Sequence, residues 1–363
     1  MKATRIRLGV LIAAVACTLG LAAPASAATT DTAQHKAIRI TSQHFAPMTT
    51  LTSQAAPACA IGGAAWESRT ESCQQGQDLI RFIDLDTGNV DGTATLQSST
   101  HTTLDPANRN RNVVEVQARI VNPTIWVAEF GEMNVSESCS SCRPSATPTR
   151  FMWPGSIQTF NMIVRSPGKK AIREDWTPTF SYQAPLYSRA NGPLAFAETT
   201  RCDSTSGMGN GCVFPKVKPV YNVSTTSTRS AQVAWHILWA QHNLKHHWGW
   251  QGHGQPLTRT MNQWLIEHNR DTACPESRPR PQGKSCDEYP FASTYQGAYL
   301  NPDYSWHMLN AVQNRLEGRD RQTWYGSVRL WAGDQFWVNV VLPPSLSNNP
   351  AAAERAAEAA LSR

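Results

Sequence analysis

The chain has 363 residues, of which 40% are hydrophobic and 17% are charged. This apolar content excludes wholesale disorder, and the length predicts two domains. No stretch of 18 apolar residues follows residue 30, so we expect no transmembrane helix and no membrane partner. The formal net charge of +6 suggests an acidic partner at first sight, but part of this charge belongs to the N-terminus.

The N-terminus has the three features of a secretory signal peptide, which we place at residues 1–27. A basic start is followed by a short apolar run and by the small-residue cleavage site Ala25-Ser26-Ala27. The basic residues are Lys2, Arg5 and Arg7. Their removal leaves a charge of only +3, which is too small to identify a partner. The sequence thus predicts a secreted, extracellular protein.

Eight cysteines remain after this cleavage, and an even number in an exported chain indicates disulfides. They are Cys59, Cys73, Cys139, Cys142, Cys202, Cys212, Cys274 and Cys286. The simplest pattern joins neighbours along the chain, although spacing does not determine connectivity. Cys139-Ser-Ser-Cys142 alternatively suggests a redox motif or half a zinc site, but no second pair has zinc spacing. A lipoprotein signal ending at Cys17 is a weaker alternative, because Ala14-Val15-Ala16 lacks the usual leucine.

The first half of the mature chain is predicted to be rich in β-strands. Residues 28–58 are polar and predict a flexible lead-in. Residues 59–221 contain strand candidates at 79–83, 114–120 and 157–164, separated by Gly, Pro, Asn and Asp clusters. These features predict a disulfide-stabilised, sandwich-like domain of unknown function, in which we find no catalytic constellation.

The second half is predicted to be a small α+β domain, which makes the whole chain α+β. A hydroxyl-rich linker is expected at 222–230, before a domain at 231–342. Within it, helical periodicity marks residues 231–247 and 257–269, and 335–342 is a strand candidate. The alanine-rich tail, 343–363, is compatible with either a terminal helix or a frayed end.

Candidate chemistry in this half centres on the adjacent acids Asp287 and Glu288. Two neighbouring carboxylates are unfavourable unless they are solvated or neutralised by a cation. His236 lies on the preceding predicted helix, and Asn269-Arg270 precedes the cation-rich 274–286 segment. Acids, a histidine and cations are what metal-assisted phosphodiester hydrolysis requires. His242 and His246 are four residues apart and suggest zinc binding, but no Glu lies between them as in helical metalloproteases.

The run Cys-Asp-Glu-Tyr-Pro-Phe-Ala-Ser-Thr-Tyr-Gln-Gly-Ala at 286–298 resembles the signature of NucA/NucB-type secreted deoxyribonucleases. The order of the flanking features is also similar: His236 on a helix, then Asn269-Arg270, the acidic core and the 333–338 strand. The resemblance spans about residues 230–342 and does not include the N-terminal half.

The resemblance implies divalent-metal-dependent cleavage of DNA, with Mg²⁺ or Mn²⁺ as the expected cofactor. It assigns catalytic roles, metal binding and phosphate binding to particular positions. Asp287, Glu288 and His236 are the catalytic candidates, Asp287, Glu288 and Asn314 the metal ligands, and Arg270 with Asn269 the substrate-binding residues. The segment 313–318 departs from the family pattern, so Glu317 is a rival to Asn314.

Two other functional classes stay open on the sequence. The altered 313–318 segment motivates a catalytically inert binding protein. A nuclease toxin acting on competing cells, with an inhibitor or immunity protein as partner, is the other alternative. The sequence does not indicate the oligomeric state or the preferred strandedness of DNA.

Overall fold

The structure is a computed structural model that describes residues 35–51, 56–205 and 208–362. The predicted signal peptide, 1–27, lies outside the described residues. The described residues cluster as one compact unit. None of the helices in the described part of the chain combines the length and hydropathy required to cross a membrane.

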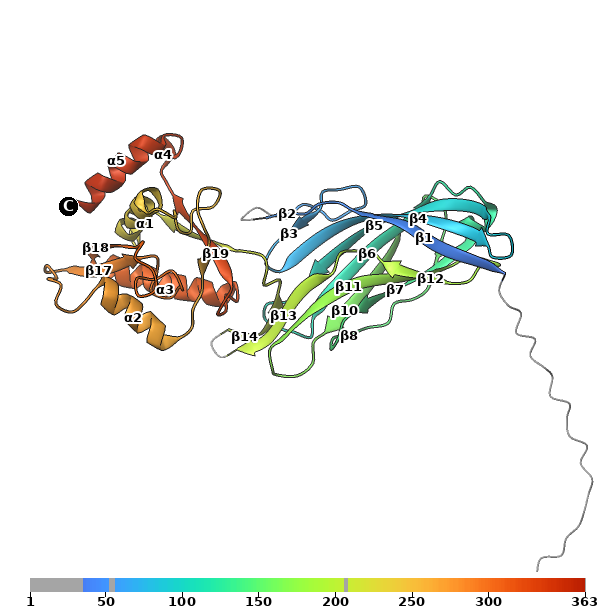
Figure 1. Cartoon of the computed structure of the whole chain (residues 1–363), viewed down its shortest axis with the longest axis horizontal. Coiled ribbons are helices and arrows are strands. Elements are labelled where there is room, and N and C mark those ends of the chain that lie inside the picture. The colour runs from blue at the N-terminus through green and yellow to red at the C-terminus, as the bar shows by residue number, and fades with distance from the viewer. Residues whose placement is uncertain (1–34, 52–55, 206–207, 363) are drawn as a thin grey trace, which may run out of the picture. The chain divides into compact units, whose positions relative to one another are not determined.

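The N-terminal part, which we define as residues 35–219, contains two sheets in which most neighbouring strands are antiparallel (Figure 1). In the first, the strands lie in the order β2-β3-β4-β5-β6-β10-β8, and β1 also pairs with β4. Its strands are β1 (Lys36–Phe45), β2 (Thr49–Thr50), β3 (Trp66–Glu67), β4 (Glu71–Asp84), β5 (Val90–Thr103), β6 (Asn112–Val121), β8 (Arg143–Pro144) and β10 (Gln158–Arg165). The second sheet has the order β14-β13-β11-β7-β9, with β12 on β11. Its elements, with a short 3-10 helix, are η1 (Trp126–Phe130), β7 (Gly131–Ser138), β9 (Arg150–Met152), β11 (Ile172–Gln183), β12 (Ala190–Pro193), β13 (Glu198–Thr205) and β14 (Gly209–Val213).

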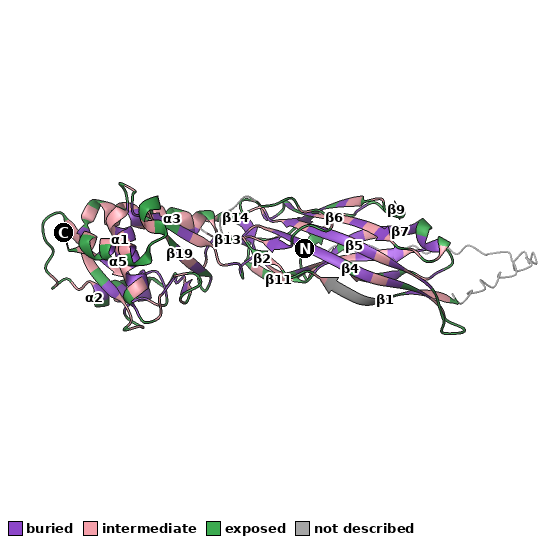
Figure 2. Cartoon of the chain, turned by 90° about the horizontal axis from the view of Figure 1, so that it is seen from above, coloured by how far each residue is buried: buried purple, intermediate pink, exposed green. Residues whose placement is uncertain are grey.

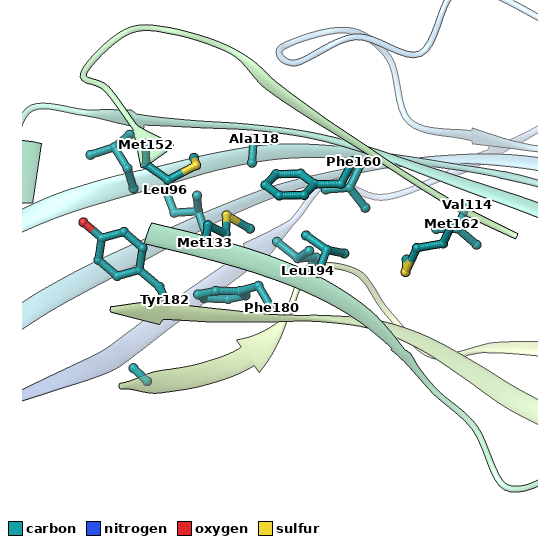
Figure 3. Packing of buried hydrophobic residues seen from close by; sticks show 14 of the residues in the cluster. Leu96, Val114, Ala118, Met133, Met152, Phe160, Met162, Phe180, Tyr182 and Leu194 are labelled. Carbon is teal, nitrogen blue, oxygen red and sulfur yellow. The ribbon is translucent and has the colours of Figure 1, made fainter. Parts of the chain in front are cut away.

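Alternating side chains of the two sheets share one hydrophobic core, as expected for a sandwich. On β6 the burial pattern alternates strictly, and Figure 2 shows the same banding along the strands. Val114 and Phe160 from the first sheet pack with Met133 and Phe180 from the second (Figure 3). The predicted fold class is therefore confirmed, and the three strand candidates correspond to parts of β4, β6 and β10.

One expectation about this part is wrong. Residues 28–58 were predicted to be a flexible lead-in, but residues 36–45 form β1 and pair with β4 from Asp84 to Gly76. The polar composition of the whole segment hid a short strand signal: Ile38 and Ile40 alternate with Arg39, and both pack on the core of the sandwich.

Three carboxyl groups are enclosed in the sandwich. Burial raises the pKa of Asp78 to about 7 and that of Glu198 to about 7. Burial, together with the charge of Glu198, raises the pKa of Glu137 to about 9. Neither oxygen of Asp78 or Glu137 has a hydrogen-bond partner among the described residues. Glu137 is therefore protonated at neutral pH in the folded protein, whereas Asp78 and Glu198 become mostly protonated only below about pH 7.

The C-terminal part, residues 220–362, has its own hydrophobic core and two small sheets. One sheet has the order β15-β19-β16, with β15 parallel to β19, and the other is the antiparallel pair β17–β18. The elements are β15 (Val220–Ser224), α1 (Ala231–Asn243), β16 (Leu257–Thr258), α2 (Gln263–Ala273), β17 (Lys284–Tyr289), β18 (Ser305–Asn310), α3 (Ala311–Ser327), β19 (Gln335–Val341), α4 (Pro344–Ser347) and α5 (Pro350–Leu361).

Several boundaries differ from those expected. Residues 222–224 of the predicted linker belong to β15. The helix expected at 257–269 begins only at Gln263, because Asn262 caps its N-terminus and residues 257–258 pair with β19. The alanine-rich tail contains the helix α5, whose Ala353 and Ala357 pack on Leu238 of α1.

All four disulfides join neighbours along the chain. The pairs are Cys59–Cys73, Cys139–Cys142, Cys202–Cys212 and Cys274–Cys286. The simplest predicted connectivity is thus confirmed. The last bridge ties the C-terminal end of α2 to β17, directly before Asp287.

A buried ionic network connects residues of the two parts. The carboxylate of Asp334 accepts hydrogen bonds from Arg69 and from Arg201, the latter at 2.7 Å to each oxygen. Arg329 in turn donates to Asp203. The side chains of Arg69, Arg201 and Asp334 are 8%, 4% and 1% exposed. Each of these charges therefore depends on its partners to offset desolvation.

Candidate active site

The antiparallel pair β17–β18 sets the positions of the central residues. Asp287 on β17 lies directly opposite His307 on β18, and Glu288 lies opposite Trp306. Because side chains alternate along a strand, Asp287 and His307 project from one face, while Glu288 and Trp306 project from the other. The first face packs against α1, which carries His236.

His236 is fully buried and both of its ring nitrogens are occupied. Nδ1 lies 2.7 Å from an oxygen of Asp287, and Nε2 lies 2.5 Å from the hydroxyl oxygen of Ser305. Burial lowers the pKa of His236 to about 3, so the ring is neutral at pH 7. The partners assign the proton to Nδ1, which donates to the carboxylate, while Nε2 accepts from the Ser305 hydroxyl. This geometry orients the Asp287 carboxylate.

Three acidic side chains gather at this point. Burial and then the charge of Glu317 raise the pKa of Asp287 well above its ordinary range. Burial and the charge of Asp287 raise the pKa of Glu288 to about 7. Glu317, on α3, is 1% exposed and accepts a 2.9 Å hydrogen bond from Arg321 one helical turn later. Arg321 also lowers the pKa of Asp287 and Glu288, so it partly compensates the acidic cluster.

The two predicted substrate-binding residues occupy different environments. Arg270 is exposed, and its charge lowers the pKa of Glu288, so it lies beside the acids and is open to solvent. Asn269 is 0% exposed and holds the loop after the acidic core. Its amide donates to the carbonyls of Ala292 and Thr294, and its side-chain oxygen accepts from the backbone of Tyr299. A side chain enclosed in this way is not available for direct contact with DNA.

Asn314, a metal-ligand candidate from the sequence, lies within the helix α3. Its amide nitrogen donates to the Ser285 hydroxyl and to the Cys286 carbonyl, each at 3.1 Å. It therefore fixes α3 against β17 just before Asp287. Glu317 lies one turn further along this helix, and it is the carboxylate whose charge acts on Asp287.

Sequence reasoning missed three residues of the site: Ser305, His307 and Arg321. His307 lies 4.8 Å from His236 between ring centroids, and its pKa is lowered to about 4 by burial and by His236. The alternation Ser-Trp-His in a strand and the Glu-x-x-x-Arg spacing in α3 were available signals. Neither indicates which distant element it will face.

The alternative zinc pair does not form on a helix, because α1 ends at Asn243. His242 instead stacks on Trp250, with ring centroids 4.4 Å apart. His246 makes a 2.7 Å contact with Asp303. Both histidines thus have other partners.

The ligand atoms that the acidic cluster offers suit a hard divalent cation. Its members offer carboxylate oxygens, which Mg²⁺ and Mn²⁺ prefer, and a cation there would offset the repulsion of Asp287 by Glu317 and of Glu288 by Asp287. Three ligand atoms lie within 4.8 Å of one another only at Cys139, Cys142 and Glu174, among the residues that the structure describes. Those cysteines are disulfide-bonded. A cation at the acidic cluster would thus have few protein ligands and several waters, as is usual for Mg²⁺.

Buried carboxylates beside an exposed arginine, on a disulfide-braced α+β scaffold, define a class of site suited to hydrolysing phosphate esters. Residues 251–339 match the family described as Deoxyribonuclease NucA/NucB, which confirms the resemblance for the C-terminal part of the chain. This match supports a DNA nuclease. It begins after α1, so His236 lies outside the matched residues. A search of curated proteins found no match to the chain.

Proposed function

We propose that this protein is a secreted, divalent-metal-dependent endonuclease that hydrolyses phosphodiester bonds of DNA. The observation that supports this most is the cluster of Asp287, Glu288 and Glu317 within the segment that matches the deoxyribonuclease family. The disulfides and the absence of a membrane-spanning helix among the described residues are consistent with an extracellular location.

Asp287 and Glu317 are the residues that would hold the cation, with Asn314 fixing the helix that carries Glu317. When bound, a divalent ion neutralises charge on the phosphate and lowers the pKa of a water molecule. His236 keeps the Asp287 carboxylate in a single orientation through its 2.7 Å contact. This assigns His236 a positioning role, since burial of both ring nitrogens prevents direct contact with DNA.

Proton transfer in this proposal belongs to residues nearer the solvent. Glu288 is half-buried and its pKa of about 7 suits a general base at neutral pH. His307 is also half-buried and, with its pKa lowered to about 4, is neutral at pH 7 and a weaker base than Glu288, so we assign the base to Glu288. Arg270 binds the phosphate through its exposed guanidinium group.

The test is cleavage of plasmid DNA by the purified mature protein with Mg²⁺ or Mn²⁺, in the presence and absence of chelator. Asp287→Asn should reduce the rate at least about a hundredfold. Asp320→Asn is the matched control, because Asp320 is a half-exposed acid on the same helix as Glu317. Cleavage that continues in chelator, or that is equal in Asp287→Asn, would reject the proposal. DNA binding without turnover in the wild type would instead favour the inert binding protein.

The contacts Ser305–His236–Asp287 also have the order of a serine-hydrolase triad. Ser305 is only 7% exposed, which is unsuited to a nucleophile acting on a polymer. Ser305→Ala distinguishes metal-dependent hydrolysis from hydrolysis by a serine nucleophile, since an enzyme that used Ser305 as its nucleophile would lose all activity. We expect this variant to retain DNA cleavage within about tenfold of wild type, with the loss arising from a less constrained His236.

A further inference from the structure

A polar pocket of about 380 Å³ lies in the N-terminal part, far in sequence from the acidic cluster. Its lining includes Phe45, Gly62, Gln75, Gln77, Gln97 and Arg119. Its volume is in the range of small-molecule sites, at about 300–1,000 Å³. Neither the sequence motifs nor the family match, which begins at residue 251, assigns a role to it.

The polar side chains of the pocket form a row across three strands. Gln77 on β4 pairs with Gln97 on β5, which pairs with Arg119 on β6. Nε of Arg119 donates a 2.8 Å hydrogen bond to the side-chain oxygen of Gln97. Because only Nε is used in this contact, the terminal guanidinium nitrogens stay available to a ligand in a fixed orientation.

The charge of Arg119 is not compensated within the pocket. No lining residue is acidic, and Arg119 makes no ion pair with any described residue. Its side chain is half-buried, so solvent only partly screens the charge. An unpaired cation among polar side chains indicates a ligand with a negative charge and polar groups.

The part of the pocket formed by Gln75 and residues 60–62 is held in place before any ligand binds. Gln75 accepts a hydrogen bond from the Gly62 backbone at 3.1 Å and donates to the Ala60 carbonyl at 3.0 Å. The Cys59–Cys73 disulfide ties the same loop to β4. Such preorganisation reduces the entropy lost on binding.

We propose that this pocket binds a carboxylate-bearing sugar unit, such as the uronic acid of an acidic polysaccharide. One arginine matches one carboxylate, since a guanidinium group binds it through two parallel hydrogen bonds. The amides of Gln77 and Gln97 both donate and accept, as sugar hydroxyl groups require. A nucleotide fits less well, because the pocket has one cation for a doubly charged phosphate. Its single aromatic, Phe45, is in edge contact with Phe196 at 4.5 Å.

The test is calorimetric titration of the mature protein, in chelator, with three ligands: a galacturonic acid trisaccharide, the neutral galactose trisaccharide and a deoxynucleoside monophosphate. We expect the uronate to bind at least tenfold more tightly than either other ligand. Arg119→Gln should weaken uronate binding at least tenfold while leaving the thermal midpoint unchanged. Arg81→Gln is the control, because Arg81 is exposed on the same face of β4, four residues beyond Gln77.

Binding of the control variant should stay within twofold of wild type. If Arg119→Gln unfolds, Gln77→Ala provides a second variant, which should weaken binding at least threefold. The proposal is overturned if the uronate does not bind, if it binds no better than the neutral sugar or the nucleotide, or if the pocket variants bind as wild type does. The measurement is independent of DNA cleavage.

Discussion

Replacing Asp334 by asparagine should destabilise the protein far more than a change at a surface ion pair. Asp334 is 1% exposed and accepts hydrogen bonds from Arg69 and Arg201. Removing one partner of a buried ion pair costs about 3–5 kcal/mol, because the other charge stays buried without compensation. Arg69 and Arg201 also donate to the carbonyl of Arg329, which places the expected loss near the lower limit, at about 3 kcal/mol.

The assay is urea unfolding with the disulfides intact, monitored by tryptophan fluorescence. With a slope of about 3 kcal/mol per molar urea, the midpoint should fall by about 1 M. The control is Asp320→Asn, which breaks the bidentate pair with Arg229 while both side chains are about half exposed. Surface pairs contribute about 0–1 kcal/mol, so this control should hardly shift the midpoint. Equal shifts in the two variants would refute the reasoning that burial makes the Asp334 network costly to break.

Two further changes test the fold. The raised pKa of Glu137, about 9, means that the folded protein binds more protons than the unfolded chain between pH 4.5 and 9. The free energy of unfolding should thus fall with rising pH, by up to about 1.4 kcal/mol per unit for this group. Below pH 7 the raised pKa values of Asp78 and Glu198 contribute in the same direction, so the test uses the range from pH 7 to 9. Glu137→Gln should remove the slope in that range; an unchanged slope there would contradict the assignment. Gly249 has φ +75°, and a Cβ there would lie 2.5 Å from the Tyr289 hydroxyl. Gly249→Ala should lower the thermal midpoint more than Gly252→Ala, which has φ +81° but open space; equal losses would attribute the effect to backbone strain alone.

The parts of the fold that depend on local pattern were predictable. Alternation on residues 114–120 indicated a half-buried strand, and β6 has this alternation. Short cysteine spacings favoured neighbour pairing, and the four bridges follow it. The start of α2 was predicted too early, because the apolar spacing of the helix extends back to Leu257. In the structure Leu257 pairs with β19 as part of a strand. The spacing of apolar residues indicates which residues are buried. Whether those residues lie in a helix or in a strand depends on the tertiary pairing.

The parts that depend on distant contacts were not predictable. Asp334 and Arg69 are 265 residues apart, and no local signal at either position indicates the other. His307 reaches the site only because β18 pairs with β17 in a register that sets it opposite Asp287. The acidic core could be identified from residue type and order, because its residues are contiguous in the sequence and therefore close in space. The residues that orient and neutralise this core come from α1, β18 and α3. Which residues of these elements reach the core depends on how the elements pack.

The acidic cluster leads to a prediction that needs no substrate. The scaffold holds Asp287, Glu288 and Glu317 together although Glu317 disfavours ionisation of Asp287 and Asp287 disfavours ionisation of Glu288, so a cation that neutralises them should stabilise the folded state. A ligand that binds only the folded protein stabilises it by about 2.7 kcal/mol at a hundred times its dissociation constant. Millimolar Mg²⁺ or Mn²⁺ should thus raise the thermal midpoint of the wild type in a DNA-free scan, and chelator should reverse the shift. Asp287→Asn should abolish the response, whereas Asp320→Asn should preserve it. A shift of equal size in all three proteins would show that the ions bind elsewhere, and the proposed ligands would then be wrong.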